Sequence, residues 1–210
     1  MMIYHPKPDE HGNSVWLKRP SKATPLRSWR QADAVATVVP GGAMPPELHG
    51  VLLEDWIDVP GSAREWDKVE GQCRIDEPPF HVPHGKQPAA GVAVREPDGR
   101  FWLVSPSNRF AGYATTLPKG PVSRQASAIR EAYEEAGLKV KITGFLADSV
   151  RSQTFTRYYL AQRVGGNPAS MGWESQAVHL VPLSALAKFL THPNDVPLLK
   201  AIHSLPISST

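Results

Sequence analysis

The chain has 210 residues, of which 41% are hydrophobic and 20% are charged, and its formal net charge is +3. These values are those of an ordinary globular protein with enough apolar residues to build a core. A disulfide within the chain is excluded because Cys73 is the single cysteine. A membrane-spanning helix is not expected, because no apolar run is long enough.

Charge is unevenly distributed along the chain. Residues 87–210 carry thirteen Lys or Arg and eight Asp or Glu, whereas residues 1–86 carry ten and twelve. The cation excess suits a phosphate-bearing ligand, but on charge alone a solvated basic surface is the simpler interpretation. Because no basic run is interleaved with aromatic residues, we expect no nucleic-acid partner and no membrane partner. The opening MMIYHPKPDE lacks the layout of a signal peptide, so we expect a cytoplasmic protein.

The first segment of the chain is rich in proline. Residues 1–86 hold eleven of the 21 prolines, a density that excludes long helices and central strands. Short strands are predicted at residues 34–39 and 51–57, and a short helix from Ser62, a good N-cap, to Gly71. We therefore interpret residues 1–86, the N-terminal extension, as an irregular segment or small subdomain beside a main domain of residues 87–210.

Regular elements begin at about Ala89. Two apolar strands, AAGVAV and FWLVS, are joined across the turn signal EPDGR. A helix is predicted from Ser123 to Ala136 and ends at Gly137. Further strands follow in VKITGFLAD, TFTRYYLAQRV and QAVHLVPL, and two short helices are predicted with Ser184 and Asp195 as caps. This alternation predicts an α/β or α+β sandwich.

The helix in residues 123–136 carries three glutamates on one face. Glu131, Glu134 and Glu135 are separated by three and four positions. One carboxylate pair at about 6 Å costs roughly 3 kcal/mol at an effective dielectric near 20, and Arg130 offsets only part of the total. Mg²⁺ or Mn²⁺ would remove the conflict and leave coordination sites for phosphate oxygens and water. A solvated acidic face is the alternative.

The stretch REAYEEAGL resembles the second half of the Nudix box, in which Gly, five residues, Glu and seven residues precede Arg-Glu-bulky-any-Glu-Glu-any-Gly-bulky. The preceding LPKG is similar to the segment that carries the opening glycine. The likeness covers about residues 89–205, and SPSNRFAGYATTLPKG is similar to the approach strands of ADP-ribose pyrophosphatase-like and diphosphoinositol polyphosphate phosphohydrolase-like members. It implies a Nudix-type α/β/α sandwich with a mixed sheet, and a hydrolase that uses Mg²⁺ or Mn²⁺.

The resemblance also implies roles for residues of this helix and turn. Glu134 and Glu135 match metal ligands, and Glu131 matches a further ligand or the base for the attacking water. The carbonyl of Gly120 matches a contact that completes the metal shell. Arg130 matches the residue that orients a glutamate through a salt bridge.

The box is shorter than the signature by four residues. Gly120 and Arg130 are ten positions apart, whereas the signature separates glycine and arginine by fourteen. The first glutamate of the signature therefore has no counterpart. Three alternatives follow: an active enzyme with a rearranged loop, a weakened enzyme, or a domain kept for binding alone.

Candidate substrate contacts lie on both sides of the helix. Ser105, Ser107 and Arg109 resemble phosphate-contacting positions of the diphosphoinositol group, although SPSNR also suits a polar turn. Tyr158 lies near the position where dinucleoside polyphosphate members often place a tyrosine, with strand packing as the alternative. Lys119, in the glycine turn, is the remaining candidate for substrate binding.

Glu174 is the single acidic residue between Asp148 and Asp195. It is a candidate base or extra ligand, with an ordinary loop glutamate as the alternative. We therefore expect a hydrolase of nucleoside diphosphates linked to another group, ADP-ribose-like compounds first. A dinucleoside or diphosphoinositol polyphosphate hydrolase is one alternative, and an impaired domain that senses a nucleotide or binds a protein is another. The expected partner is a phosphorylated small molecule, and a homodimer is left open.

Overall fold

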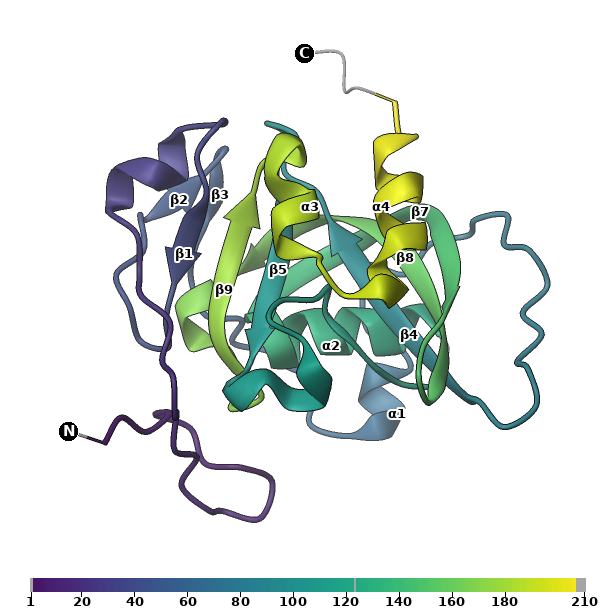
Figure 1. Cartoon of the computed structure of the whole chain (residues 1–210), viewed down its shortest axis with the longest axis horizontal. Helices are drawn as coiled ribbons and strands as arrows, with labels where there is room; N and C mark the ends of the chain where they lie inside the picture. Colours follow the sequence, from purple (N-terminus) through teal and green to yellow (C-terminus); the bar gives the residue numbers. More distant parts are fainter. Residues whose placement is uncertain (1, 123, 207–210) are drawn as a thin grey trace.

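The computed structural model describes residues 2–122 and 124–206, and its larger sheet is mixed (Figure 1). The strand order of this sheet is β6-β4-β8-β7. Strands β4 (Gln87–Val94) and β8 (Thr154–Gly166) run parallel, while β7 (Leu138–Val150) is antiparallel to β8 and β6 (Lys119–Pro121) is antiparallel to β4. The sequence predicted β7 and β8 correctly, and the structure confirms the mixed sheet.

A second sheet joins the N-terminal extension to the main domain. Its order is β1-β9-β5, and β9 (Ser175–Val181) is antiparallel to both β1 (Ala36–Val38) and β5 (Phe101–Pro106). The strand predicted at residues 34–39 is therefore confirmed in its centre. A separate pair consists of β2 (Glu47–Leu48) and β3 (Val51–Leu52).

The strand predicted at residues 51–57 is mostly wrong, because it ends after Leu52. The chain then turns so that Trp56 packs edge-on against Trp66 and Tyr133. The EPDGR turn is confirmed by a hydrogen bond in which the Glu96 amide donates to the Arg100 carbonyl at 2.9 Å. The two strands that this turn joins, β4 and β5, nevertheless belong to different sheets. Both are buried, and β4 pairs along its length with β8, whereas β5 pairs with β9.

Helices cover both faces of the sheets, as Figure 1 shows, and the predicted α/β/α sandwich is confirmed. Helix α2 (Gln125–Ala136) packs on one face, with α1 (Ala63–Trp66) beside it, and α3 (Leu186–Phe189) and α4 (Val196–His203) pack on the other. The remaining helical turns are η1 (Leu26–Arg30), η2 (Ser107–Gly112), η3 (Pro168–Ser170), η4 (Leu183–Ala185) and η5 (Pro193–Asp195). Within the described residues, no helix has both the length and the apolarity that a membrane crossing requires.

The predicted helix caps were only partly correct. Ser62 caps α1 by accepting from the Glu65 amide at 3.3 Å, and the left-handed Gly137 ends α2 at φ 68°. The helix from Ser62 stops at Trp66 rather than Gly71. Ser123, the predicted start of α2, lies outside the described residues, and the helix runs from Gln125.

Of the two predicted caps near the C-terminus, Ser184 is wrong, and Asp195 is correct in position only. Ser184 lies inside η4, and α3 begins after it. Asp195 precedes α4 but makes no side-chain cap bond. Its carboxylate instead pairs with the buried guanidinium of Arg151 at 2.7 Å. A buried cation needs a charged partner more than a helix end needs a cap, because a cap is replaceable by other donors and acceptors.

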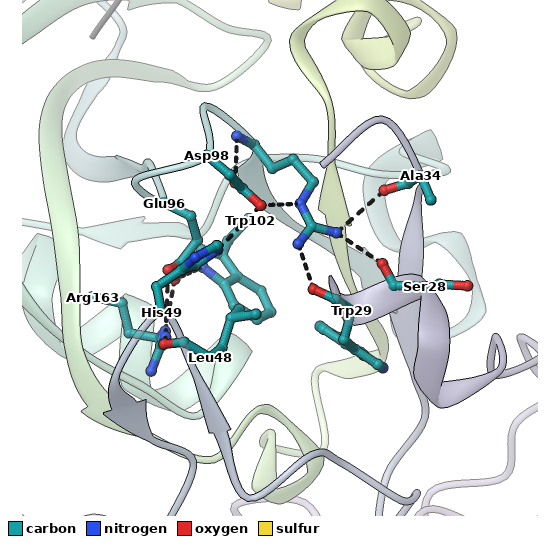
Figure 2. Close-up of polar contacts among 10 residues, drawn as sticks. Ser28, Trp29, Ala34, Leu48, His49, Glu96, Asp98, Trp102 and Arg163 are labelled. Atoms are coloured by element: carbon teal, nitrogen blue, oxygen red, sulfur yellow. Dashed lines mark hydrogen bonds and ion pairs between the residues drawn. The ribbon is translucent and has the colours of Figure 1, made fainter. Parts of the chain in front are cut away.

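Arg100 of the main domain holds the N-terminal extension through the carbonyls of three residues, which Figure 2 labels as Ser28, Trp29 and Ala34. Its side chain is 0% exposed and forms an ion pair with Asp98 at 2.8 Å. The guanidinium also donates to the backbone carbonyls of Ser28 at 3.0 Å and Ala34 at 3.3 Å, and to that of Trp29. One buried cation of the main domain thus satisfies three carbonyls of the extension.

Arg163 forms a second contact of this kind (Figure 2). It pairs with Glu96 at 2.7 Å and donates to the carbonyl of Leu48, in β2, at 2.8 Å. The same carboxylate accepts from the indole of Trp102 at 2.7 Å. Since buried polar groups are costly unless paired, these networks fix where the extension lies on the main domain.

Candidate active site

The carboxylate of Glu131 lies directly against the α-carbon of Gly120. Glu131 comes from the middle of α2 and is 4% exposed, while Gly120 is the central residue of β6. A Cβ atom at Gly120 would overlap this carboxylate, so the close approach requires glycine. Burial first, and then the Glu134 carboxylate, raise the pKa of Glu131 to about 7.

Glu135 is held by the backbone that precedes Gly120. The amide of Lys119 donates to Oε2 of Glu135 at 3.1 Å. Burial raises the pKa of Glu135 to about 8, although the Lys119 ammonium acts in the opposite direction. The ammonium itself lies 5.3 Å from the centre of the Tyr113 ring. Lys119 therefore contacts the site through its backbone, while its side chain rests on an aromatic face.

Arg130 contacts two of the three glutamates. Its Nη2 atom lies 3.2 Å from Oε1 of Glu131, and its Nε atom lies 3.6 Å from Oε2 of Glu134. The Glu134 side chain is 50% exposed. Partial burial raises the pKa of Glu134, and Arg130 counteracts this. The guanidinium thus contacts one buried and one half-exposed carboxylate.

Glu174 lies beside these glutamates, in a cavity that we call the acidic cavity. Its volume is about 320 Å³. Residues that line it are Lys7, Glu10, Tyr133, Glu134, Gly172, Trp173 and Glu174. Burial and the Glu10 carboxylate raise the pKa of Glu174. Sequence patterns gave no signal for Lys7 or Glu10, because folding alone brings the extension to α2.

The four carboxylates are close enough to affect one another, but they are not arranged as a finished metal centre. Glu174 raises the pKa of Glu131, Glu134 and Glu135. Within the described residues, no three His, Cys, Asp or Glu side chains form a group that could hold an ion. Carboxylate oxygens are the donors that Mg²⁺ and Mn²⁺ prefer, and a cation would relieve their repulsion. The carboxylate oxygens are therefore chemically suited to bind Mg²⁺ or Mn²⁺, but the side chains would have to move closer together to do so.

The expected shared face of the three glutamates is only partly present. Glu131 points into the protein toward β6, whereas Glu134 reaches the surface. The chain that leads into α2 contains an unusual backbone conformation. Val122 adopts φ 74°, which a β-branched residue rarely does. No residue replaces the missing glutamate within the described part of this connection, Lys119–Val122 and Arg124.

A larger cavity of about 680 Å³ lies at the end of β5, and we call it the basic cavity. Residues that line it are Lys18, Arg19, Pro20, Ser21, Ser105, Asn108, Arg109, Ala114, Thr115, Gln176, His179, Lys188, Phe189 and Thr191. Two of the predicted substrate contacts, Ser105 and Arg109, are among them. No pattern in the sequence indicated His179 or the lining residues of the N-terminal extension.

His179 links the two outer strands of the smaller sheet. Its Nδ1 atom lies 2.8 Å from Oγ1 of Thr37, in β1, and its Nε2 atom lies 2.8 Å from Oγ of Ser105, in β5. Burial lowers the pKa of His179 to about 4. The imidazole is therefore neutral at physiological pH and acts as a polar bridge rather than as a cation.

Two other predicted substrate-binding residues, Ser107 and Tyr158, interact with other parts of the protein. Ser107 donates from its hydroxyl to the carbonyl of Trp173 at 2.7 Å, and its amide donates to the carbonyl of Glu174 at 2.7 Å. It thereby joins the segment of the acidic cavity to the end of β5. Tyr158 is 0% exposed, and the Arg151 guanidinium lies 5.4 Å from its ring centre. This burial favours strand packing for Tyr158 over substrate binding.

Comparisons with known proteins match the main domain. The family model described as NUDIX domain matches residues 85–202. None of the curated proteins compared matches the chain. Three of the similar solved structures are a NUDIX hydrolase from Nitrosomonas europaea, an Ap4A hydrolase from C. elegans in a binary complex, and an ADP-ribose pyrophosphatase from Streptococcus suis.

The likeness to these structures is limited. The Nitrosomonas hydrolase is 20% identical over 59% of this chain and 76% of its own, with a TM-score of 0.48. The corresponding values are 22%, 56%, 96% and 0.45 for the C. elegans protein. They are 20%, 47%, 75% and 0.39 for the Streptococcus protein.

Proposed function

Because the chain belongs to the NUDIX family, we propose that it is a metal-dependent hydrolase that cleaves the diphosphate linkage of a nucleoside diphosphate joined to another group. ADP-ribose-like compounds are the first candidates. One observation carries the proposal: the Glu131 carboxylate lies against Gly120, while Glu135 accepts from the preceding backbone amide. This pairing of helix and glycine turn puts acidic oxygens beside partly buried backbone, and carboxylate oxygens are the donors that a phosphate-bound Mg²⁺ or Mn²⁺ prefers.

Glu131, Glu134 and Glu135, with the carbonyl of Gly120, would hold Mg²⁺ or Mn²⁺. The ion would supply charge neutralisation for the diphosphate and activation of a water molecule. Arg130 keeps two of these carboxylates oriented through its ion pairs. Orientation matters here because catalytic groups must be held within about half an ångström of their working positions.

Glu174 is the candidate base for the attacking water. It lines the same cavity as Glu134, and burial raises its pKa, which makes a carboxylate a better proton acceptor near neutral pH. Lys119 would stabilise phosphate charge, since its ammonium acts to lower the pKa of both Glu135 and Glu174. These roles are proposed for residues in and around the C-terminal half of α2.

A sensor or protein-binding domain is the alternative of another class. It is favoured by the missing first glutamate of the box, and by the absence of a grouped metal site among the described residues. The strained Val122 connection points the same way, because the four-residue deletion falls there. A dinucleoside or diphosphoinositol polyphosphate hydrolase remains the alternative within enzymes.

The test is turnover of ADP-ribose, Ap4A and NADH with Mg²⁺ or Mn²⁺, followed by anion-exchange chromatography of the products. Glu134→Gln and Glu135→Gln should each lower turnover at least about a hundredfold, since each removes a charged metal ligand. Glu54→Gln, at an exposed glutamate away from both cavities, is the control and should not change turnover. Ligand-induced thermal stabilisation without turnover would support the sensor instead.

A further inference from the structure

The basic cavity gathers positive charge without a compensating acid. Lys18, Arg19, Arg109 and Lys188 line it, and no Asp or Glu does so among the described residues. None of these four side chains takes part in an ion pair within the described part of the chain. Like charges around one hollow repel one another, and a bound anion would reverse that cost.

The wall of the cavity is polar rather than aromatic. Gln176 is 7% exposed, and its Oε1 atom has no hydrogen-bond partner in the structure. Ser105 and Thr115 place further hydroxyl groups in the wall. Phe189 is the single Phe, Tyr or Trp among the described lining residues, so a base cannot be stacked between two such rings. This lining suits a hydrophilic, charged group better than a nucleobase.

Half of the positive charge comes from the N-terminal extension, and the structure shows how it is held there. Asn108 donates from its side-chain amide to the carbonyl of Trp16 at 2.8 Å and accepts from the amide of Lys18 at 2.9 Å. Asn108 itself has φ 56°, a conformation that asparagine tolerates. The following residue, Arg109, belongs to the same wall. The extension is therefore pinned to the loop that carries the main-domain arginine.

The two cavities lie near each other at one end of the smaller sheet. Ser107 follows β5 and binds the Trp173–Glu174 segment, which precedes β9 and lines the acidic cavity. Its neighbours Asn108 and Arg109 line the basic cavity. The N-terminal extension passes both, with Lys7 and Glu10 at the acidic cavity and Lys18 and Arg19 at the basic one.

We propose that the basic cavity binds a phosphorylated group, so that the preferred substrates are diphosphates whose second group carries phosphates of its own, and that Lys18 and Arg19 of the extension select for this charge. The identity of the ligand as a substrate rests on the proposed hydrolase function. The affinity of the cavity for a phosphorylated group does not rest on it.

The experiment is isothermal titration calorimetry of the full chain with fructose 1,6-bisphosphate, a compact anion that contains no diphosphate bond. Fructose is the uncharged comparison ligand. The bisphosphate should bind, and Lys18→Ala/Arg19→Ala should weaken it at least about tenfold, because two charge-assisted contacts are lost. Arg109→Ala should weaken binding as well. Both extension residues are exposed, so the double variant should unfold at the same temperature as the wild type.

The matched control is Lys22→Ala/Arg27→Ala, which removes the same charge from exposed positions of the same extension outside the cavity. It should change the bisphosphate affinity less than about twofold. Equal weakening by the two double variants would reduce the effect to net charge and overturn the proposal. Binding of fructose as tightly as the bisphosphate, or no binding of either, would also overturn it.

A kinetic comparison then separates this proposal from the proposed function. If the bisphosphate binds as expected but no diphosphate is hydrolysed, the hydrolase assignment fails and the anion site stands. If ADP-ribose is hydrolysed with a higher kcat/KM than ADP-ribose carrying an added phosphate on its terminal ribose, the selectivity proposal fails and the hydrolase stands. If Lys18→Ala/Arg19→Ala lowers kcat/KM for the phosphorylated ADP-ribose but not for ADP-ribose itself, the result would support both the hydrolase function and the selectivity proposal.

Discussion

Lowering the pH should destabilise the fold through His179. This residue is 7% exposed and bonded at both ring nitrogens, and burial lowers its pKa from 6.5 to about 4. Between these pH values the unfolded chain binds a proton at His179 that the folded chain does not. The free energy of unfolding is therefore not reduced by His179 above pH 6.5, and it falls as the pH drops toward 4. At about 1.4 kcal/mol per pKa unit, the loss between pH 7 and pH 5 is about 2 kcal/mol.

Urea unfolding of the wild type and of His179→Gln at both pH values measures this loss. Glutamine stays polar but does not titrate, so the contributions of all other groups cancel in the comparison. The wild type should lose about 2 kcal/mol more free energy of unfolding than the variant when the pH falls from 7 to 5. An equal loss in both proteins would show that His179 accepts a proton in the folded state, and the argument from its burial would be refuted.

Two further predictions concern the glycine turn and the N-terminal extension. Gly120→Ala should lower the free energy of unfolding by about 1–3 kcal/mol, because its Cβ overlaps the Glu131 carboxylate. Gly144→Ala is the control in urea unfolding, since nothing lies within 4 Å of its added Cβ, and equal effects would contradict this account. Arg100→Ala should cost about 3–5 kcal/mol in thermal unfolding and expose the extension to trypsin, because Asp98 and three carbonyls lose a buried partner. Unfolding and cleavage unchanged from the wild type would show that this contact does not hold the extension.

Features determined by neighbouring residues could be predicted from the sequence. The Ser62 cap, the left-handed Gly137 and the long strands β7 and β8 each depend on a few consecutive residues. The Nudix box could be recognised for the same reason. These signals were enough for the sandwich and for the helix that carries the candidate site.

Features that depend on distant partners could not be predicted. Asp195 looks like a cap until Arg151 is placed beside it, and Glu131 looks solvated until β6 covers it. Lys18 enters the basic cavity because a bond to Asn108, ninety residues away, holds it there. The sequence has no local pattern that reports such contacts, so the extension looked irregular even though it lines both cavities.

The smaller sheet gives the N-terminal extension a protective role as well. All seven residues of β9 are buried, and β1 covers one of its edges along Ala36–Val38. A protein trimmed to the family-matched residues 85–202 would leave that edge without hydrogen-bond partners, and apolar edges of this kind pair readily with other chains. The trimmed protein should therefore aggregate, even though it would keep every glutamate of the candidate site.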